Sequence, residues 1–158
     1  MAADLRAAAL DSPEVAPLLA ALHADYLARY GPSDEMALAV PADFSPPDGL
    51  FVVVVDAGVT VAGGGFRRHG PETCEVKRMW TAPGSRRRGL AGTVLDALEA
   101  AAASAGYRRL VLETGPAQPE AARLYAARGY RRIERFGPYP EALAFATELP
   151  RPPAACDP

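Results

Sequence analysis

The stretch best suited to chemistry is a run of basic and small residues at 86–92. It consists of Arg86, Arg87, Arg88, Gly89, Leu90, Ala91 and Gly92. A helical pattern begins inside the run, and the first N–H groups of a helix have no partner within it. The helix dipole adds partial positive charge there, and glycine lets a ligand approach the backbone closely. Together with the three arginines, these features predict a phosphate-binding site.

Composition limits what kind of protein carries this site. The chain has 158 residues and a formal net charge of −2, which disfavours a nucleic-acid binder that depends on excess positive charge. Two cysteines, Cys74 and Cys156, form no disulfide framework, and no His/Cys spacing fits a zinc site. The N-terminal residues lack a signal-peptide layout, and no apolar run is long enough for a membrane span. We therefore expect a cytoplasmic protein without a bound metal, a nucleic-acid partner or a membrane partner.

The first elements that position the run follow from hydrophobic periodicity. A strand is expected at residues 5–10. A helix should begin at 11–14, where a polar cap, a proline and an acidic residue follow one another. Its apolar face consists of Val15, Leu18, Leu19, Leu22 and Tyr26, and it should end near residue 30. Residues 32–49 predict a loop, in which one helical turn over 34–38 stays open.

The remaining pattern predicts a meander of three strands and then two helices and three further strands. The meander covers 50–56, 59–68 and 73–81, and the later elements cover 90–105, 109–114, 119–128, 130–135 and 142–149. Gly63, Gly64 and Gly65 lie inside the second meander strand and indicate a bulge or a close approach of two backbones.

The order β-α-β-β-β-α-β-α-β-β predicts an α/β (α+β) fold with a mixed, mostly antiparallel central sheet flanked by helices. Residues 1–149 should form a single domain, and the Pro-rich residues 150–158 a mobile tail. The order disfavours a doubly wound nucleotide-binding fold, because that fold needs a glycine-rich turn after its first strand.

Two motifs in the second half resemble those of the GNAT superfamily of N-acetyltransferases. Residues 86–91 fit that family's pyrophosphate loop, Gln/Arg-x-x-Gly-x-Gly/Ala, between a strand and a helix as the mechanism requires. Residues 118–130 fit a second pattern, Asn-x-x-Ala-x-x-Leu-Tyr-x-x-x-Gly-Phe, with two departures, Gln118 and Tyr130. Tyr130 keeps an apolar ring, whereas Gln118 lengthens the amide side chain that the family directs toward the cofactor.

The resemblance implies an N-acetyltransferase that uses acetyl-CoA as donor and attaches the acetyl group to an amine by direct attack. Tyr125 would then protonate the leaving thiolate, since a phenol is protonated at neutral pH. Glu75 would be the base and Glu113 its rival, unless Glu75 only pairs with Lys77 or Arg78 and Tyr125 only packs. The implied cofactor-binding residues are Met79, Trp80, Thr81, Arg86, Arg87, Arg88, Gly89, Leu90, Ala91, Gly92, Gln118 and Tyr125.

The acceptor is expected to be a small-molecule or amino-acid-like amine. By the resemblance it would lie between the first helix with its following loop and the turn between the last two strands. The residues assigned to it are Tyr30, Glu75, Glu113, Phe136 and Tyr139. Acetylation of a protein amine, or a catalytically silent acyl-CoA-binding module, are the alternatives. A homodimer through the last strands is also expected from the resemblance.

Overall fold

Seven strands form one sheet in the computed structural model, which describes residues 3–32 and 40–151. They are β1 (Asp4–Ala7), β2 (Leu50–Asp56), β3 (Val59–Arg68), β4 (Thr73–Thr81), β5 (Arg109–Thr114), β6 (Arg131–Ile133) and β7 (Leu143–Glu148). Their order is β1-β2-β3-β4-β5-β7-β6, and only the pair β4 and β5 is parallel. The predicted mixed, mostly antiparallel sheet is confirmed.

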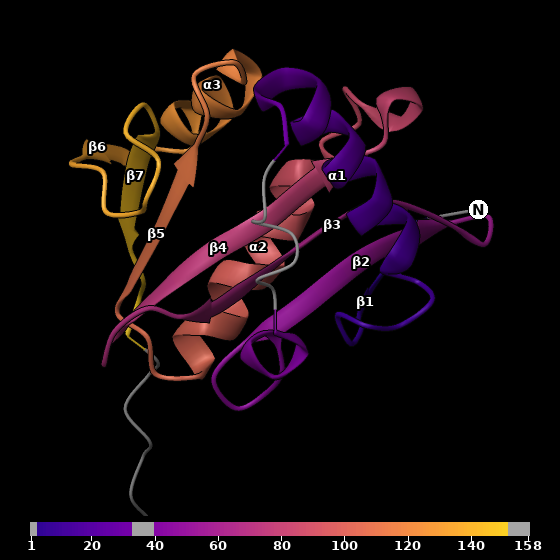
Figure 1. Cartoon of the computed structure of the whole chain (residues 1–158). Coiled ribbons are helices and arrows are strands. Elements are labelled where there is room, and N and C mark those ends of the chain that lie inside the picture. The colour runs from indigo at the N-terminus through magenta and orange to yellow at the C-terminus, as the bar shows by residue number, and fades with distance from the viewer. Residues whose placement is uncertain (1–2, 33–39, 152–158) are drawn as a thin grey trace, which may run out of the picture.

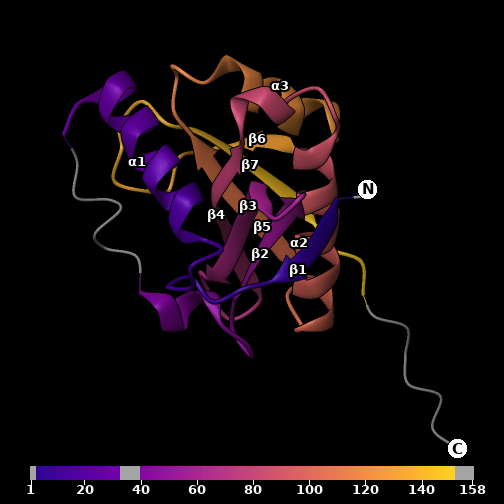
Figure 2. The ribbon, with the colours of Figure 1, turned by 90° about the vertical axis from the view of Figure 1, so that its right-hand side faces the viewer.

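Helices cover both faces of this sheet. Helix α1 (Ala16–Tyr30) lies on one face, and helices α2 (Leu90–Ser104) and α3 (Pro119–Ala127) lie on the other (Figure 1, Figure 2). Two short 3-10 helices, η2 (Pro41–Phe44) and η3 (Pro83–Ser85), lie in the connections. Among the described residues, no helix has the length and apolar character that crossing a bilayer requires.

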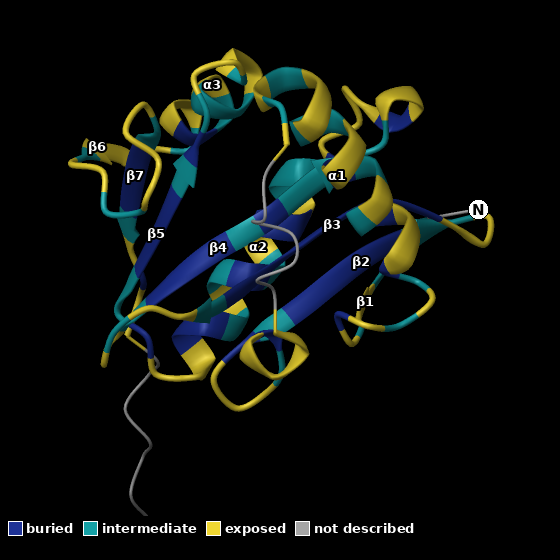
Figure 3. Ribbon diagram, in the orientation of Figure 1, coloured by how far each residue is buried: buried dark blue, intermediate teal, exposed yellow. Residues whose placement is uncertain are grey.

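Strand β2 shows how the sequence builds a core on each side of the sheet. Val52 and Val54 pack with α2, whereas Phe51 and Val53 pack beneath α1, because successive residues of a strand face opposite sides. The valine run is therefore buried on both faces, as its continuous apolar character predicts. Figure 3 shows the central strands buried and the outer surfaces of the helices exposed.

Two predictions near the N-terminus are wrong. Strand β1 ends at Ala7 rather than residue 10, and Leu10 turns into the core beneath α1, where it is 4% exposed. Helix α1 begins at Ala16, so the predicted start at 11–14 is a series of turns. The carbonyl of Ser12 accepts the N–H groups of Val15 and Ala16, which shows that the polar and proline signals serve a turn before the helix. The predicted helical turn at 34–38 and tail residues 152–158 lie outside the described residues.

The sheet opens between its two parallel strands. Strand β4 pairs with β5 only from Thr73 to Glu75, while β5 stays paired with β7 along its full length. The second half of β4, residues 76–81, therefore diverges from β5. This opening is the main feature that positions the functional site.

A bulge in β4 lies beside the opening. Arg78 has φ 63°, and the register with β3 shifts so that Arg78 and Met79 together face Gly64. A Cβ at Gly63 would lie 2.7 Å from the Val52 carbonyl oxygen, and one at Gly65 2.7 Å from the Leu50 carbonyl oxygen, so the β2 and β3 backbones approach closely at these glycines. The close backbone approach predicted from the glycine-rich strand is confirmed, whereas the bulge lies in the facing strand β4 rather than in β3 itself.

Candidate active site

The start of α2 is an open, curved turn. Arg87 and Gly89 have left-handed backbone conformations, with φ 66° and 72°, and turns of this kind can form anion-binding concavities. Among the described residues, no side chain caps the helix. A Cβ at Gly89 would meet no atom within 4 Å. The first N–H groups of α2 are therefore accessible to an anion.

A cavity of about 370 Å³ lies against this turn, between the diverging part of β4 and helices α2 and α3. Its wall includes most of the residues predicted to bind a cofactor. These are Met79, Trp80, Thr81, Arg86, Arg87, Gly89, Leu90, Ala91, Gly92, Gln118 and Tyr125. Arg88 does not line this cavity, because its Nη1 lies 2.9 Å from the Asp56 carboxylate at the end of β2.

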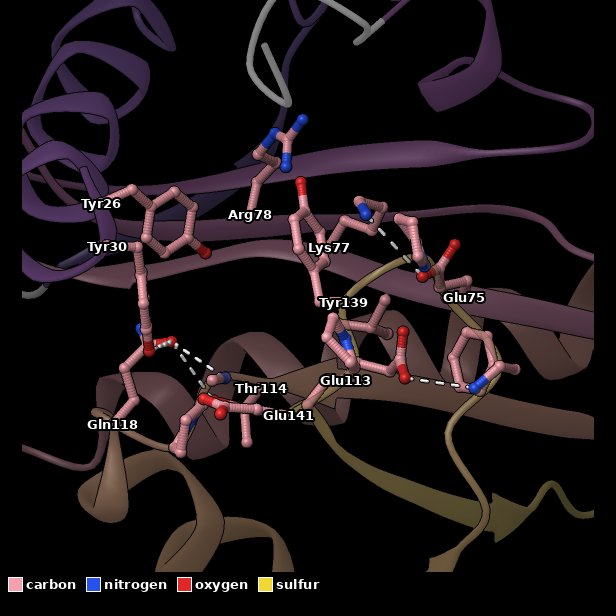
Figure 4. Close-up of a pocket in the computed structure, with 18 of the residues that line it drawn as sticks. Tyr26, Tyr30, Glu75, Lys77, Arg78, Glu113, Thr114, Gln118, Tyr139 and Glu141 are labelled. Carbon is pink, nitrogen blue, oxygen red and sulfur yellow. Dashed lines mark hydrogen bonds and ion pairs between the residues drawn. The ribbon is translucent and has the colours of Figure 1, made fainter. Parts of the chain in front are cut away.

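A second cavity, of about 550 Å³, lies on the α1 face of the sheet. Its wall includes all five residues predicted for the acceptor, Tyr30, Glu75, Glu113, Phe136 and Tyr139. The two cavities meet at the opening between β4 and β5, and both are lined by Tyr26, Val76, Lys77, Arg78, Glu113 and Gln118. Figure 4 shows Glu113 and Tyr139 at the centre of this wall, with Tyr26 and Tyr30 to one side and the Glu75–Lys77 pair to the other.

Several residues of this second cavity were not assigned to the site from the sequence. Arg67 lies at the end of β3, His69 directly follows that strand, and Tyr26 comes from α1. Tyr26 belongs to the apolar face of the first helix, which the resemblance places beside the acceptor. Counting residue pairs outward from the β3–β4 turn places Arg67 opposite Glu75, so the hairpin register is the signal that identifies Arg67.

The two glutamates have different surroundings. The Glu75 side chain is only 8% exposed. Its Oε1 accepts from Arg67 Nε at 3.3 Å and Nη2 at 3.1 Å, and its Oε2 lies 3.8 Å from Lys77 Nζ. Glu113 Oε2 accepts the Phe136 N–H at 3.2 Å, and within the described residues Glu113 forms no ion pair. Both glutamates line the larger cavity, but only Glu113 also lines the smaller one.

Gln118 lines both cavities and forms hydrogen bonds to the elements around them. Its Oε1 accepts the Gly115 N–H at 3.2 Å, the Tyr30 hydroxyl at 3.3 Å and the Thr114 hydroxyl at 3.5 Å. A Cβ at Gly115 would collide with the Tyr30 hydroxyl, so glycine is needed for this contact. The amide oxygen thus ties α1 to the β5–α3 turn, and the amide NH₂ group is the part of the side chain able to donate to a ligand.

Comparison with known proteins identifies the family. Residues 17–130 match the model of the Acetyltransferase (GNAT) family. The chain belongs to this family. A curated relative from Azospirillum brasilense, named IAA acetyltransferase, is 34% identical over 128 residues, which cover 79% of this chain and 83% of the relative. The chain is therefore a GNAT acetyltransferase with acetyl-CoA as its donor.

Solved structures share the GNAT fold. An acetyltransferase of the GNAT family from Staphylococcus aureus superposes with a TM-score of 0.78 at 14% identity, over 94% of this chain and 100% of that chain. A GNAT family acetyltransferase from Elizabethkingia anophelis, solved with acetyl-CoA bound, has a TM-score of 0.71 at 20% identity, over 93% of this chain and 98% of that chain. At these identities the likeness concerns the fold.

The smaller cavity of this GNAT enzyme has backbone groups that can form hydrogen bonds with acetyl-CoA. Residues 76–81 of β4 diverge from β5, so their backbone groups on that side are available to amide groups of the pantetheine arm. The uncapped start of α2 offers N–H groups to the pyrophosphate. The residues present therefore fit the donor at both ends of the cavity.

Tyr125 is placed in this cavity as a buried phenol. It is 5% exposed, and its ring stacks on Tyr130 with centroids 5.7 Å apart and lies 5.7 Å from that of Phe145. Burial raises the pKa of Tyr125 well above its usual value of 10.0, and the nearby Tyr26 adds to this shift. The phenol is consequently protonated throughout the neutral range, as a proton donor must be.

Proposed function

We propose that this GNAT enzyme acetylates the nitrogen of a small amine that binds in the cavity of about 550 Å³. The observation that carries the proposal is the meeting of the two cavities at the opening between β4 and β5, beside Lys77 and Glu113. An amine in the larger cavity and a thioester in the smaller one would lie next to each other there, as direct attack requires.

The size of the larger cavity supports a small-molecule acceptor over a protein. Pockets for small molecules have volumes of about 300–1,000 Å³, and this cavity lies within that range. Aromatic side chains from α1 and from the segment before β7 form much of its wall, including Tyr26, Tyr30, Phe136 and Tyr139. Enclosure by aromatic groups suits a small organic amine. IAA, named in the relative from Azospirillum brasilense, is one compound to include among the acceptors tested.

Glu113 is the proposed proton acceptor in place of Glu75. Both oxygens of Glu75 already face the cations of Arg67 and Lys77, so this carboxylate serves to hold neighbouring strands and cations together. In the part of the chain that the structure describes, the one hydrogen bond to the Glu113 carboxylate comes from the Phe136 N–H, to Oε2. Its Oε1 is left to accept a proton from the ammonium form of the acceptor, directly or through water.

Tyr125 is the proposed proton donor to the leaving thiolate. Acetyl-CoA supplies the acetyl group as a thioester that a neutral amine attacks. The ammonium form of the acceptor first releases one proton to solvent through Glu113 and becomes the neutral amine. Its nitrogen then bonds to the acetyl carbon as the carbon–sulfur bond breaks, loses a second proton to Glu113, and Tyr125 gives one proton to the sulfur. Transfer of the proton from Glu113 to the Tyr125 phenolate through solvent returns both residues to their starting states. The left-handed bulge at Arg78 turns the β4 backbone beside the opening, where an N–H group could stabilise negative charge on the thioester oxygen.

The test is thiol release from acetyl-CoA with a panel of small amines and IAA, using wild type, Glu113→Gln and Glu75→Gln. We expect Glu113→Gln to lower kcat about 10²–10⁴-fold with little change in acetyl-CoA affinity. Glu75→Gln should act mainly on KM and stability. A larger kcat loss in Glu75→Gln than in Glu113→Gln would reverse the assignment, and acetylation of peptides alone would favour a protein acceptor.

The homodimer and the cytoplasmic location stay predictions.

A further inference from the structure

A row of charged side chains crosses three strands on the α1 face of the sheet. Arg67 on β3 is paired in register with Glu75 on β4, and Glu75 is paired with Val111 on β5. Cross-strand partners share a face, and so do residues two apart on one strand. Lys77 and Glu113 therefore belong to the same row, and all four charged residues line the larger cavity.

The pairing of Arg67 leaves part of its guanidinium unused. Its Nε and Nη2 both donate to the single oxygen Glu75 Oε1, at 3.3 Å and 3.1 Å, instead of gripping both carboxylate oxygens. Across the described residues, Glu75 is the only hydrogen-bond partner of the Arg67 side chain. The side chain is 31% exposed and lines the cavity. Its Nη1 group is thus available to an anionic group of a bound ligand.

His69 lies two residues after Arg67, directly beyond the end of β3, and adds a second donor. Its ring packs edge-on against Phe136, with centroids 4.8 Å apart, and both residues line the cavity. An imidazole carries at least one N–H group. Arg67 and His69 together form a donor pair at one end of the cavity, and the aromatic contact holds the imidazole in place.

The other end of the row carries the proposed base. A Cβ at Gly137 would collide with Glu113 Oε1, so the carboxylate is pressed against the segment before β7. Strand spacings of about 4.8 Å and a rise of about 3.3 Å per residue place the Cα atoms of Arg67 and Glu113 roughly 12 Å apart. The side chains of Arg67 and Glu113 take up much of this distance. A ligand that contacts both can therefore have only a few covalent bonds between its anionic group and its cationic group.

We propose that the acceptor is an amino acid, with its carboxylate held by Arg67 and His69 and its amine facing Glu113. This inference rests on the proposed function and names its substrate class. The aromatic wall from Tyr26, Tyr30 and Tyr139 then surrounds an apolar side chain.

The experiment compares amino acids with the amines that lack only the carboxylate. The pairs are L-phenylalanine and 2-phenylethylamine, L-leucine and 3-methylbutylamine, and L-alanine and ethylamine, each assayed for kcat/KM with saturating acetyl-CoA. Arg67→Gln alone would leave the buried Glu75 without its guanidinium partner. The test variant is therefore the double substitution Arg67→Gln/Glu75→Gln, and Glu75→Gln, which keeps Arg67, is its matched control.

We expect wild type and Glu75→Gln to favour the amino acids, and the double variant to lose about 10- to 100-fold of that preference. Comparing variants on the same pairs cancels the different basicity of the amines. Equal rate losses on both members of each pair, or a wild type indifferent to the carboxylate, would overturn the inference and leave the proposed function standing. Acetyl-CoA binding without turnover of any amine would overturn the proposed function, and this inference with it.

Discussion

Replacing Gly89 with alanine separates the conformational role of this glycine from its role toward the donor. Gly89 begins α2 with φ 72° and lines the smaller cavity. A left-handed alanine is less stable than glycine by roughly 1–2 kcal/mol, and the stiffer unfolded chain offsets about 0.4–1 kcal/mol of this. We expect Gly89→Ala to lower the free energy of unfolding by about 1 kcal/mol. The fold should persist, because the new Cβ meets no protein atom within 4 Å.

The effect on the donor should be larger. With the pyrophosphate at its proposed site, a methyl group at Gly89 would crowd it and would lengthen the hydrogen bonds that the first N–H groups of α2 would donate. Each hydrogen bond to a charged group contributes about 1.5–3 kcal/mol. Loss of one such bond raises the Kd for acetyl-CoA about 10- to 100-fold. Isothermal titration of acetyl-CoA measures this change.

Gly129→Ala is the matched control. Gly129 has φ 85°, its Cβ would also meet nothing within 4 Å, and it lines neither cavity. It should lose the same stability and keep full affinity for acetyl-CoA. Acetyl-pantetheine, which lacks the pyrophosphate, should bind Gly89→Ala as it binds wild type. Equal acetyl-CoA affinity in the two alanine variants would refute the placement of the pyrophosphate at α2.

Two further predictions concern the buried titratable groups. Tyr125→Phe keeps the ring contacts with Tyr130 and Phe145, so we expect an unchanged Kd for acetyl-CoA and a kcat about 10²–10⁴-fold lower; a kcat within threefold of wild type would remove Tyr125 from the chemistry. Burial raises the pKa of Cys74 from 9.0 to about 12, so the folded chain keeps a proton that the unfolded chain loses. Its stabilising contribution is complete below pH 9 and falls by at most about 1.4 kcal/mol per pH unit as the pH rises toward about 12. Urea midpoints from pH 8 to 11 measure this fall, which should be shallower in Cys74→Ala; identical slopes would contradict it.

Much of the fold follows from local signals in the sequence. Strands β2 to β5 begin and end at the predicted residues, because β-branched runs alternate with turns marked by glycine and proline. Of two helix starts predicted from local sequence, the one at 11–14 is wrong and the one at Gly89 is correct. The polar residues at 11–14 form a turn, whereas Gly89 adopts the left-handed conformation that the start of α2 needs.

The acceptor side of the site depends on long-range contacts that the hydrophobic periodicity of the sequence does not predict. Arg67 and Glu75 meet because of the β3–β4 register, and Glu113 reaches both cavities because β4 leaves β5 after Glu75. The Gln118 amide oxygen accepts a hydrogen bond from Tyr30, which lies 88 residues away in the sequence. Such long-range pairings decide which of two glutamates is engaged by cations, and a single sequence does not encode them in any local pattern.

In the proposed reaction, an amine in the larger cavity receives the acetyl group directly from acetyl-CoA. The most direct measurement mixes the enzyme with acetyl-CoA labelled with carbon-13 in the acetyl group and an amine that it turns over, and follows the label by mass spectrometry. Direct transfer predicts one labelled N-acetyl product for each free thiol formed, with no labelled enzyme at any time. Labelled acetate formed in place of the N-acetyl product, or a labelled enzyme that forms before the product, would contradict it.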